Sequence, residues 1–169
     1  HNKPGAKLAQ FQERGARSAV KKALSQEQWD EAIKQGLKVL AVNPWDVTTL
    51  TSMATAANKM GDLEPEMFFL KCAWEANPKD PDVNRQVAQA LEARDLFDQA
   101  IASWHRVEQA RPGDEEAQRA IASLAVKKTI KLGGYDTDDE DKKLGGKRSG
   151  QVAQQEELTM EERMRRRID

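Results

Sequence analysis

Three prolines recur at a fixed spacing along this chain of 169 residues. Pro44, Pro78 and Pro112 are 34 residues apart, and each lies in a similar tetrapeptide, NPWD, NPKD or RPGD. The segments before the prolines keep the same phase, since WDEAI at 29–33 and FDQAI at 97–101 lie equally far from the next proline. A period of this length is typical of helical arrays in which each unit packs only on its neighbours. The chain is therefore predicted to fold as a repeat array.

Each 34-residue unit contains two helical segments separated by a short break. In the third unit Ala100, Ile101, Trp104 and Val107 recur at three- and four-residue intervals, a helical rather than an alternating period. The breaks hold residues that tolerate turn geometry, such as Gly61 in the second unit. The proline ends each second segment because it cannot continue the hydrogen-bond ladder. We expect helices at 13–25, 28–41, 47–60, 63–76, 81–93 and 97–109.

With the proline at position 32, the units run over 13–46, 47–80 and 81–114, and we call them repeats 1, 2 and 3. Repeat 3 has Phe97 at position 17, Ala100 at position 20 and Trp104 at position 24. These residues resemble the tetratricopeptide repeat family, whose helix-turn-helix unit has bulky residues at positions 17 and 24 and a small one at position 20. The resemblance covers residues 13–131. It implies an all-α solenoid wound into a right-handed superhelix.

Two residues depart from the family pattern. Gly36 stands at position 24 of repeat 1, where a bulky side chain is expected. Glu66 stands at position 20 of repeat 2, where the family has alanine. Both departures fall at positions that the resemblance assigns to packing.

The rest of the chain divides into four further segments. A polar arm is expected at 1–12, and an amphipathic closing helix at 115–131, which covers the last repeat and is ended by Gly133 and Gly134. The stretch 132–155 is acidic and glycine-rich with few apolar residues, and is predicted to be a linker. Helical character returns at 156–169, where a short C-terminal helix is expected.

Composition excludes several classes of function. One cysteine, Cys72, and two histidines cannot build a disulfide framework or a Cys/His zinc site, so no metal and no cofactor is expected. His105 has no serine or cysteine paired with it in the sequence pattern, and the protein is predicted not to be an enzyme. No segment approaches the roughly 20 apolar residues of a membrane span, which favours a cytoplasmic protein without membrane contact.

The resemblance also implies where a ligand binds. In tetratricopeptide arrays the first helix of each unit lines a concave groove that receives a peptide. Here Arg17, Lys21, Lys59 and Arg85 are expected to hold carboxylates there. The amides of Asn58 and Gln89 are expected to hydrogen-bond an extended backbone. The predicted groove residues are Arg14, Arg17, Lys21, Thr48, Thr51, Thr55, Asn58, Lys59, Asp82, Arg85, Gln89, Glu92, Arg119, Ser123 and Lys127.

One subfamily of these repeats grips chaperone tails with a lysine-asparagine-asparagine-lysine-arginine clamp, and this chain matches it incompletely. Thr55 and Asp82 stand where an asparagine-class residue and a lysine are wanted. We therefore do not predict a chaperone co-factor.

Three functions remain as hypotheses. The first is an adaptor or scaffold that binds an acidic or extended peptide of a protein partner in the groove. The second is a self-assembling scaffold, in which the C-terminal tail or the acidic run at 136–141 occupies the groove of its own or another chain. RNA binding is the least favoured, because the net charge is -1 and the groove includes Asp82 and Glu92.

Overall fold

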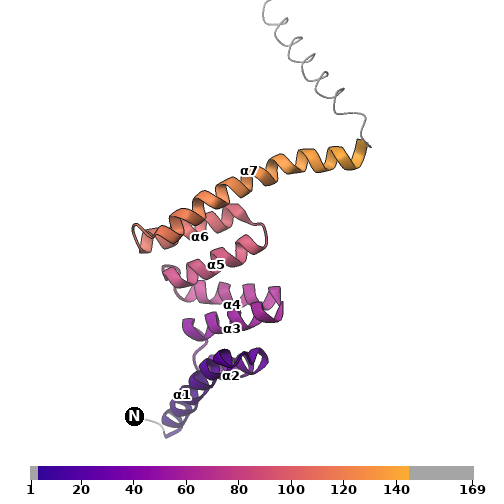
Figure 1. Cartoon of the computed structure of the whole chain (residues 1–169). Coiled ribbons are helices and arrows are strands. Elements are labelled where there is room, and N and C mark those ends of the chain that lie inside the picture. Colours follow the sequence, from indigo (N-terminus) through magenta and orange to yellow (C-terminus); the bar gives the residue numbers. More distant parts are fainter. Residues whose placement is uncertain (1–3, 145–169) are drawn as a thin grey trace, which may run out of the picture. The chain divides into compact units, whose positions relative to one another are not determined.

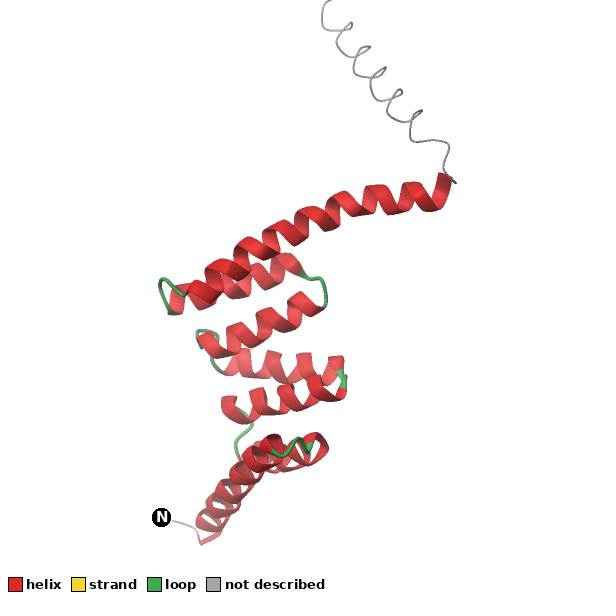
Figure 2. Cartoon of the chain, in the orientation of Figure 1, coloured by secondary structure: helices red, strands yellow, loops and turns green. Residues whose placement is uncertain are grey.

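The computed structural model describes residues 4–144, with side chains described for residues 5–133. Over these residues the chain forms seven helices and no strand, and short turns join the helices (Figures 1 and 2). The helices are α1 (Pro4–Ser25), α2 (Trp29–Val42), α3 (Val47–Met60), α4 (Leu63–Ala76), α5 (Pro81–Ala93), α6 (Phe97–Ala110) and α7 (Glu115–Leu144). The predicted bounds of α2 to α6 agree with the observed ones within one residue, so two helices per repeat are confirmed.

Helix α1 is longer than the sequence predicted. It begins at Pro4 rather than near residue 13, so most of the predicted arm at 1–12 is helical. Proline suits a first helical turn, because the N–H that it lacks would have no partner there. The added turns escaped prediction because their apolar residues Leu8 and Phe11 are exposed and so mark no buried face.

Helix α7 also extends past its predicted end. The pair Gly133 and Gly134 was expected to stop the helix, but it continues to Leu144. Residues 132–144 of the predicted linker are therefore helical. A glycine inside a helix costs about 1 kcal/mol relative to alanine, but it keeps its backbone hydrogen bonds and does not force an end. The remaining predicted linker at 145–155 and the predicted helix at 156–169 lie outside the described residues.

The helices pack first within a repeat and then between repeats. Helices α1 and α2, α3 and α4, and α5 and α6 form antiparallel pairs, and α2 contacts α3 as α4 contacts α5 (Figure 1). The largest buried cluster joins Ala100, Trp104 and Val107 of α6 to Ala117 and Leu124 of α7. The first turns of α7 therefore cover repeat 3, as the closing helix was predicted to do.

The aspartate that ends each recurring tetrapeptide stands just before the next helix, and Asp80 and Asp114, unlike Asp46, cap that helix with a side-chain oxygen. Asp80 accepts hydrogen bonds at Oδ1 from the backbone N–H groups of Asp82 and Val83, at 2.9 and 3.1 Å. Asp114 accepts one at Oδ1 from the N–H of Ala117 at 2.9 Å. Such caps satisfy backbone donors that have no partner within the helix. The recurring motif thus combines a helix stop at proline with a helix start at aspartate.

The glycine at position 24 of repeat 1 leaves room for a side chain from repeat 2. A Cβ atom built on Gly36 would lie 2.5 Å from Sδ of Met53, which is fully buried. Met53 belongs to α3, and its side chain occupies the space that a side chain at position 36 would need. The departure from the family pattern is therefore compensated by a neighbouring helix.

The chain forms two compact parts, His1–Ala125 and Val126–Asp169, and the three repeats belong to the first. No helix within residues 4–144 is both long and apolar enough to cross a membrane. The fold class is all-α, as predicted. The right hand of the superhelix stays a prediction.

Candidate functional site

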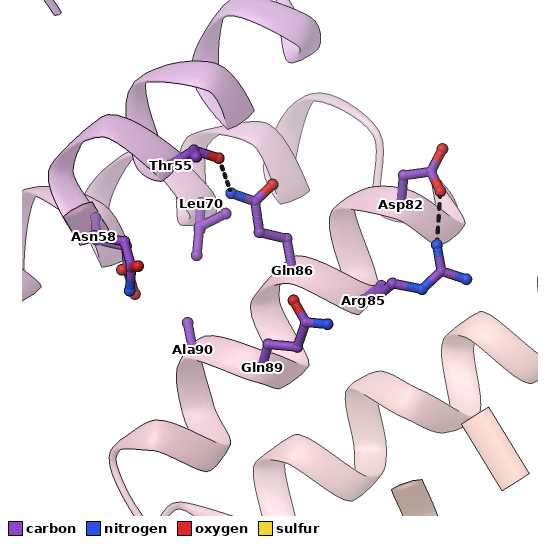
Figure 3. Close-up of a pocket in the computed structure, with 9 residues that line it drawn as sticks. Thr55, Asn58, Leu70, Asp82, Arg85, Gln86, Gln89 and Ala90 are labelled. Atoms are coloured by element: carbon purple, nitrogen blue, oxygen red, sulfur yellow. Dashed lines mark hydrogen bonds and ion pairs between the residues drawn. The ribbon is translucent and has the colours of Figure 1, made fainter. Parts of the chain in front are cut away.

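A cavity of about 440 Å³ opens between α3 and α5, and we call it the α3–α5 pocket. Its polar residues come mainly from the first helices of repeats 2 and 3, and we call its buried residues Glu66, Leu70 and Ala90 the floor. Figure 3 shows Leu70 and Ala90 of this floor together with the wall residues. The lining residues are Thr55, Asn58, Glu66, Leu70, Asp82, Arg85, Gln86, Gln89 and Ala90.

Five predicted groove residues meet at this pocket. Thr55 and Asn58 reach it from α3, and Asp82, Arg85 and Gln89 reach it from α5. They occupy the unit positions that the family resemblance assigned to the groove. Their role in binding stays a prediction, but the structure brings them around one cavity.

A hydrogen-bonded glutamine holds the two walls of the pocket together. The Nε2 atom of Gln86 donates to the carbonyl oxygen of Thr51 and to the hydroxyl of Thr55, each at 3.1 Å (Figure 3). Thr51 turns its own hydroxyl to the carbonyl oxygens of Val47 and Thr48. These contacts hold α5 against α3. The side chains of Gln86 and Thr51 are therefore engaged in packing the two helices together.

Two other amide side chains at the pocket make no hydrogen bond between the helices within the described residues. Asn58 on α3 and Gln89 on α5 are exposed, and neither side-chain amide has a hydrogen-bond partner among the described residues. Figure 3 shows Asn58 on the α3 wall and Gln89 on the α5 wall, with Ala90 next to Gln89 on α5. Each amide offers both a donor and an acceptor to an incoming group.

Arg85 is surrounded by carboxylates of its own chain. Its guanidinium lies 3.0 Å from Oδ1 of Asp82, 3.6 Å from Oδ2 of Asp114 and 2.7 Å from Oε2 of Glu116. Arg111 adds a further contact to Asp82 at 3.3 Å. The side chain that was expected to hold a ligand carboxylate is thus already neutralised. The sequence could not show this, because two of the three partners are the last residue of repeat 3, Asp114, and a residue of α7, Glu116.

Two more of the predicted cations are already paired with carboxylates of the chain. Arg17 pairs with Glu13 at 2.5 Å and with Asp46 at 3.3 Å, so it also faces acidic groups of its own chain. Arg119 pairs with Glu115 at 2.7 Å, and both side chains are well exposed.

Three predicted cations remain uncommitted. Arg14 and Lys21 on α1 and Lys59 on α3 are exposed and form no ion pair with any residue of the described range. Lys127 belongs to the second compact part, Val126–Asp169, and is not among the residues that line the α3–α5 pocket. A carboxylate ligand would therefore find its unengaged cations on α1 and at the end of α3.

The sequence analysis did not place four lining residues in the groove, and two of them, Glu66 and Gln86, are polar. Gln86 occupies a position that the family resemblance does not assign to the groove, so no signal marked it. Glu66 was noted as a departure from alanine at position 20, but its side chain was not connected with the groove. A carboxylate at a packing position is the signal that could have found it.

A second cavity of about 290 Å³ lies between α4 and α6 and is largely apolar. Met67 and Trp74 of α4 and Val87 of α5 line it, and Arg106 of α6 lies with its guanidinium carbon 5.5 Å from the ring centre of Trp74. Its polar lining residues are Lys71, Gln99, Ser103 and Arg106, and of the lining residues only Gln99 carries a side-chain amide.

Cys72 lies on α4 and His105 lies on α6, each in ordinary surroundings. Burial raises the pKa of the Cys72 thiol, Glu75 raises it further, and Lys71 opposes them. A raised pKa keeps the thiol protonated, and the thiolate is the reactive form. The Nδ1 atom of the exposed His105 lies 3.6 Å from Oε2 of Glu108, one turn along α6.

No protein-family model matches the sequence, and no curated protein sequence does either. Solved structures do match the fold. The first tetratricopeptide repeat domain of Spaghetti (RPAP3), bound to the HSP90 peptide SRMEEVD, superposes with a TM-score of 0.65 at 18% identity, over 70% of this chain and 94% of that one. The Sgt2 domain of the same type from Aspergillus fumigatus gives 0.65 at 17% identity, over 73% and 83%.

A third structure adds a bacterial example. The type III secretion chaperone SycD of Yersinia enterocolitica, in complex with a peptide of the translocator YopD, gives a TM-score of 0.62 at 11% identity, over 68% of this chain and 93% of that one. The TM-scores establish that the fold is shared, and at identities this low the likeness carries no more than the fold. The chain has the tetratricopeptide repeat fold, as its 34-residue period predicted.

Proposed function

We propose that this protein is a non-enzymatic interaction module that binds an extended peptide segment of a partner protein in the α3–α5 pocket. The observation that carries the proposal is the pair of unengaged amides, Asn58 and Gln89, which line one cavity from α3 and α5. Two solved domains of the same fold hold peptides, one of HSP90 and one of YopD. Their example supports a peptide as the ligand class.

Side-chain amides at this place suit an extended peptide backbone. A peptide in extended conformation presents alternating N–H and C=O groups, and an asparagine or glutamine amide can pair with one of each. Gln86 and Thr55 are already bonded to each other, so the walls are set before a ligand arrives. A wall that does not reorganise lowers the cost of binding.

Cations on α1 and at the end of α3 that are unpaired within the described residues favour acidic residues in the parts of the bound segment that lie outside the pocket. Arg14, Lys21 and Lys59 are exposed and unengaged within the described residues, whereas Arg17 and Arg85 face carboxylates of their own chain. Acidic side chains of the peptide are therefore expected beside α1 and the end of α3. The α3–α5 pocket itself is not expected to take them.

The test begins from a library of random 12-residue peptides displayed on phage and selected on the immobilised full chain. A synthetic copy of an enriched peptide, carrying a fluorophore, is then titrated with the unmodified chain and with Asn58→Ala/Gln89→Ala, and fluorescence anisotropy gives the two dissociation constants. Two lost hydrogen bonds of about 1 kcal/mol each correspond to roughly 30-fold weaker binding. Both side chains are exposed, so the variant is expected to keep the fold.

The matched control is Gln10→Ala/Gln109→Ala, which removes two exposed amides from α1 and α6. We expect the control to bind the peptide within twofold of the unmodified chain. Failure of the library to yield any enriched peptide would overturn the proposed function. Equal weakening by both double variants would show that the groove amides are not the contact.

A further inference from the structure

The floor of the α3–α5 pocket contains a carboxylate in a place where the fold usually has a methyl group. Glu66 lies in the first turn of α4, and its side chain is only 3% exposed. Withdrawing a charged carboxylate from water is costly unless it is paired and hydrogen-bonded. An alanine would avoid that cost, so the side chain calls for an explanation.

One oxygen of Glu66 is paired and the other is not. Nη1 of Arg94 donates to Oε1 at 3.0 Å. The same guanidinium donates to the carbonyl oxygens of Leu63 at 2.6 Å and Ala90 at 2.7 Å, so its position is set by three acceptors. Oε2 of Glu66 is buried and has no hydrogen-bond partner within the described part of the chain. A buried acceptor of this kind is unusual in native proteins.

The rest of the pocket suits a particular kind of incoming group. Leu70 and Ala90 give the floor an apolar surface that can cover a hydrocarbon stem. The charged residues that line it are Glu66, Asp82 and Arg85, and Arg85 is neutralised by carboxylates. A carboxylate entering here would meet two of its own sign. An N–H donor on an apolar stem would meet an unpaired acceptor.

We propose that Glu66 is a specificity-determining residue, whose Oε2 atom accepts a hydrogen bond from an N–H donor side chain of the bound peptide. The N–H donors that end a flexible hydrocarbon stem are the side chains of lysine, arginine, asparagine and glutamine. The inference rests on the proposed function, since it assigns one subsite within the same groove. It places a donor residue in the α3–α5 pocket, while acidic residues of the peptide lie beside the cations of α1 and α3.

The test compares the unmodified chain with Glu66→Gln. Glutamine keeps an oxygen that can accept from Arg94 and replaces the other oxygen with a donor. In the phage library described above, the unmodified chain should enrich a lysine, arginine, asparagine or glutamine at one peptide position. Replacing that residue by norleucine, which has the stem without the donor, should weaken binding roughly 10-fold or more to the unmodified chain. The same replacement should change binding to Glu66→Gln less than about twofold, because the acceptor is gone.

Two further arms sharpen the result. Glu75→Gln removes an exposed carboxylate from the same helix but outside the pocket, and should retain the full norleucine effect. Exchanging an enriched lysine for glutamine in the peptide distinguishes a cationic donor from a neutral amide donor. Retained affinity supports a neutral amide donor, and lost affinity supports a cation.

Failures of the two proposals are distinguishable. Absence of any enriched peptide overturns the proposed function. Enriched peptides without a donor preference, or a norleucine effect that is equal in Glu66→Gln, overturn the role of Glu66 and leave the groove as the binding site. If circular dichroism shows that Glu66→Gln does not fold, Glu66→Ala/Arg94→Ala replaces it. That variant removes both charges together, and the norleucine effect should vanish in it as well.

Discussion

Removing Arg94 should destabilise the protein far more than removing its acidic partner. In Arg94→Ala the carboxylate of Glu66 stays in a site where it is 3% exposed and loses its ion pair with Arg94. Breaking a buried pair in this way costs about 3–5 kcal/mol, because an uncompensated charge is left behind. In Glu66→Ala the guanidinium of Arg94 keeps two carbonyl acceptors. The cost there is about 1–2 kcal/mol, that of one charged hydrogen bond, reduced slightly by the helix propensity of alanine.

The double variant Glu66→Ala/Arg94→Ala completes the cycle. It leaves no buried charge, so it should cost less than Arg94→Ala alone, and the coupling between the two residues should reach about 2 kcal/mol or more. Free energies of unfolding come from urea titrations followed by circular dichroism at 222 nm. Arg119→Ala is the surface control, because its pair with Glu115 is exposed and is expected to contribute less than about 0.5 kcal/mol. A cost below about 1 kcal/mol for Arg94→Ala, or additive single costs, would refute the buried-pair reasoning.

Other predictions follow from the packing and the ends of the chain. Gly36→Ala should lower the free energy of unfolding by about 1–2 kcal/mol in urea titrations, because the crowding of Met53 outweighs the gain in helix propensity; greater stability would contradict this. Since burial and then Glu75 raise the pKa of Cys72, alkylation by iodoacetamide, followed by mass spectrometry, should keep accelerating above pH 9.0. Glu75→Gln should speed that reaction at pH 8 by lowering the pKa, and an unchanged rate would count against the assignment. Deleting 145–169 should raise peptide affinity several-fold if the tail competes for the groove, and equal affinity in fluorescence anisotropy would remove the tail as an occupant.

The helices could be predicted from the sequence because their ends carry local signals. The proline of each tetrapeptide stops a helix, and the aspartates of the second and third, Asp80 and Asp114, bond backbone donors within three residues. The start of α1 and the end of α7 lack such signals. Pro4 looks the same in a helix start as in a loop, and Gly133 weakens a helix without ending it. The predicted ends were therefore wrong there and accurate within the repeats.

The site was only partly predictable because its chemistry depends on contacts between repeats. Unit positions marked Asn58 and Gln89 without knowledge of the structure, since position alone decides which face of a first helix they occupy. The neutralisation of Arg85 by Glu116 and the pairing of Glu66 with Arg94 join residues from different repeats or from the closing helix. No local pattern encodes such pairs.

The central claim is that this fold binds a peptide between α3 and α5, and chemical-shift mapping tests it most directly. The ¹⁵N-labelled full chain is titrated with an enriched peptide from the phage selection. The largest shifts should fall on the side-chain amides of Asn58 and Gln89 and on backbone amides of α3 and α5. Shifts concentrated instead around Trp74 and Arg106, on the cavity between α4 and α6, would contradict the claim.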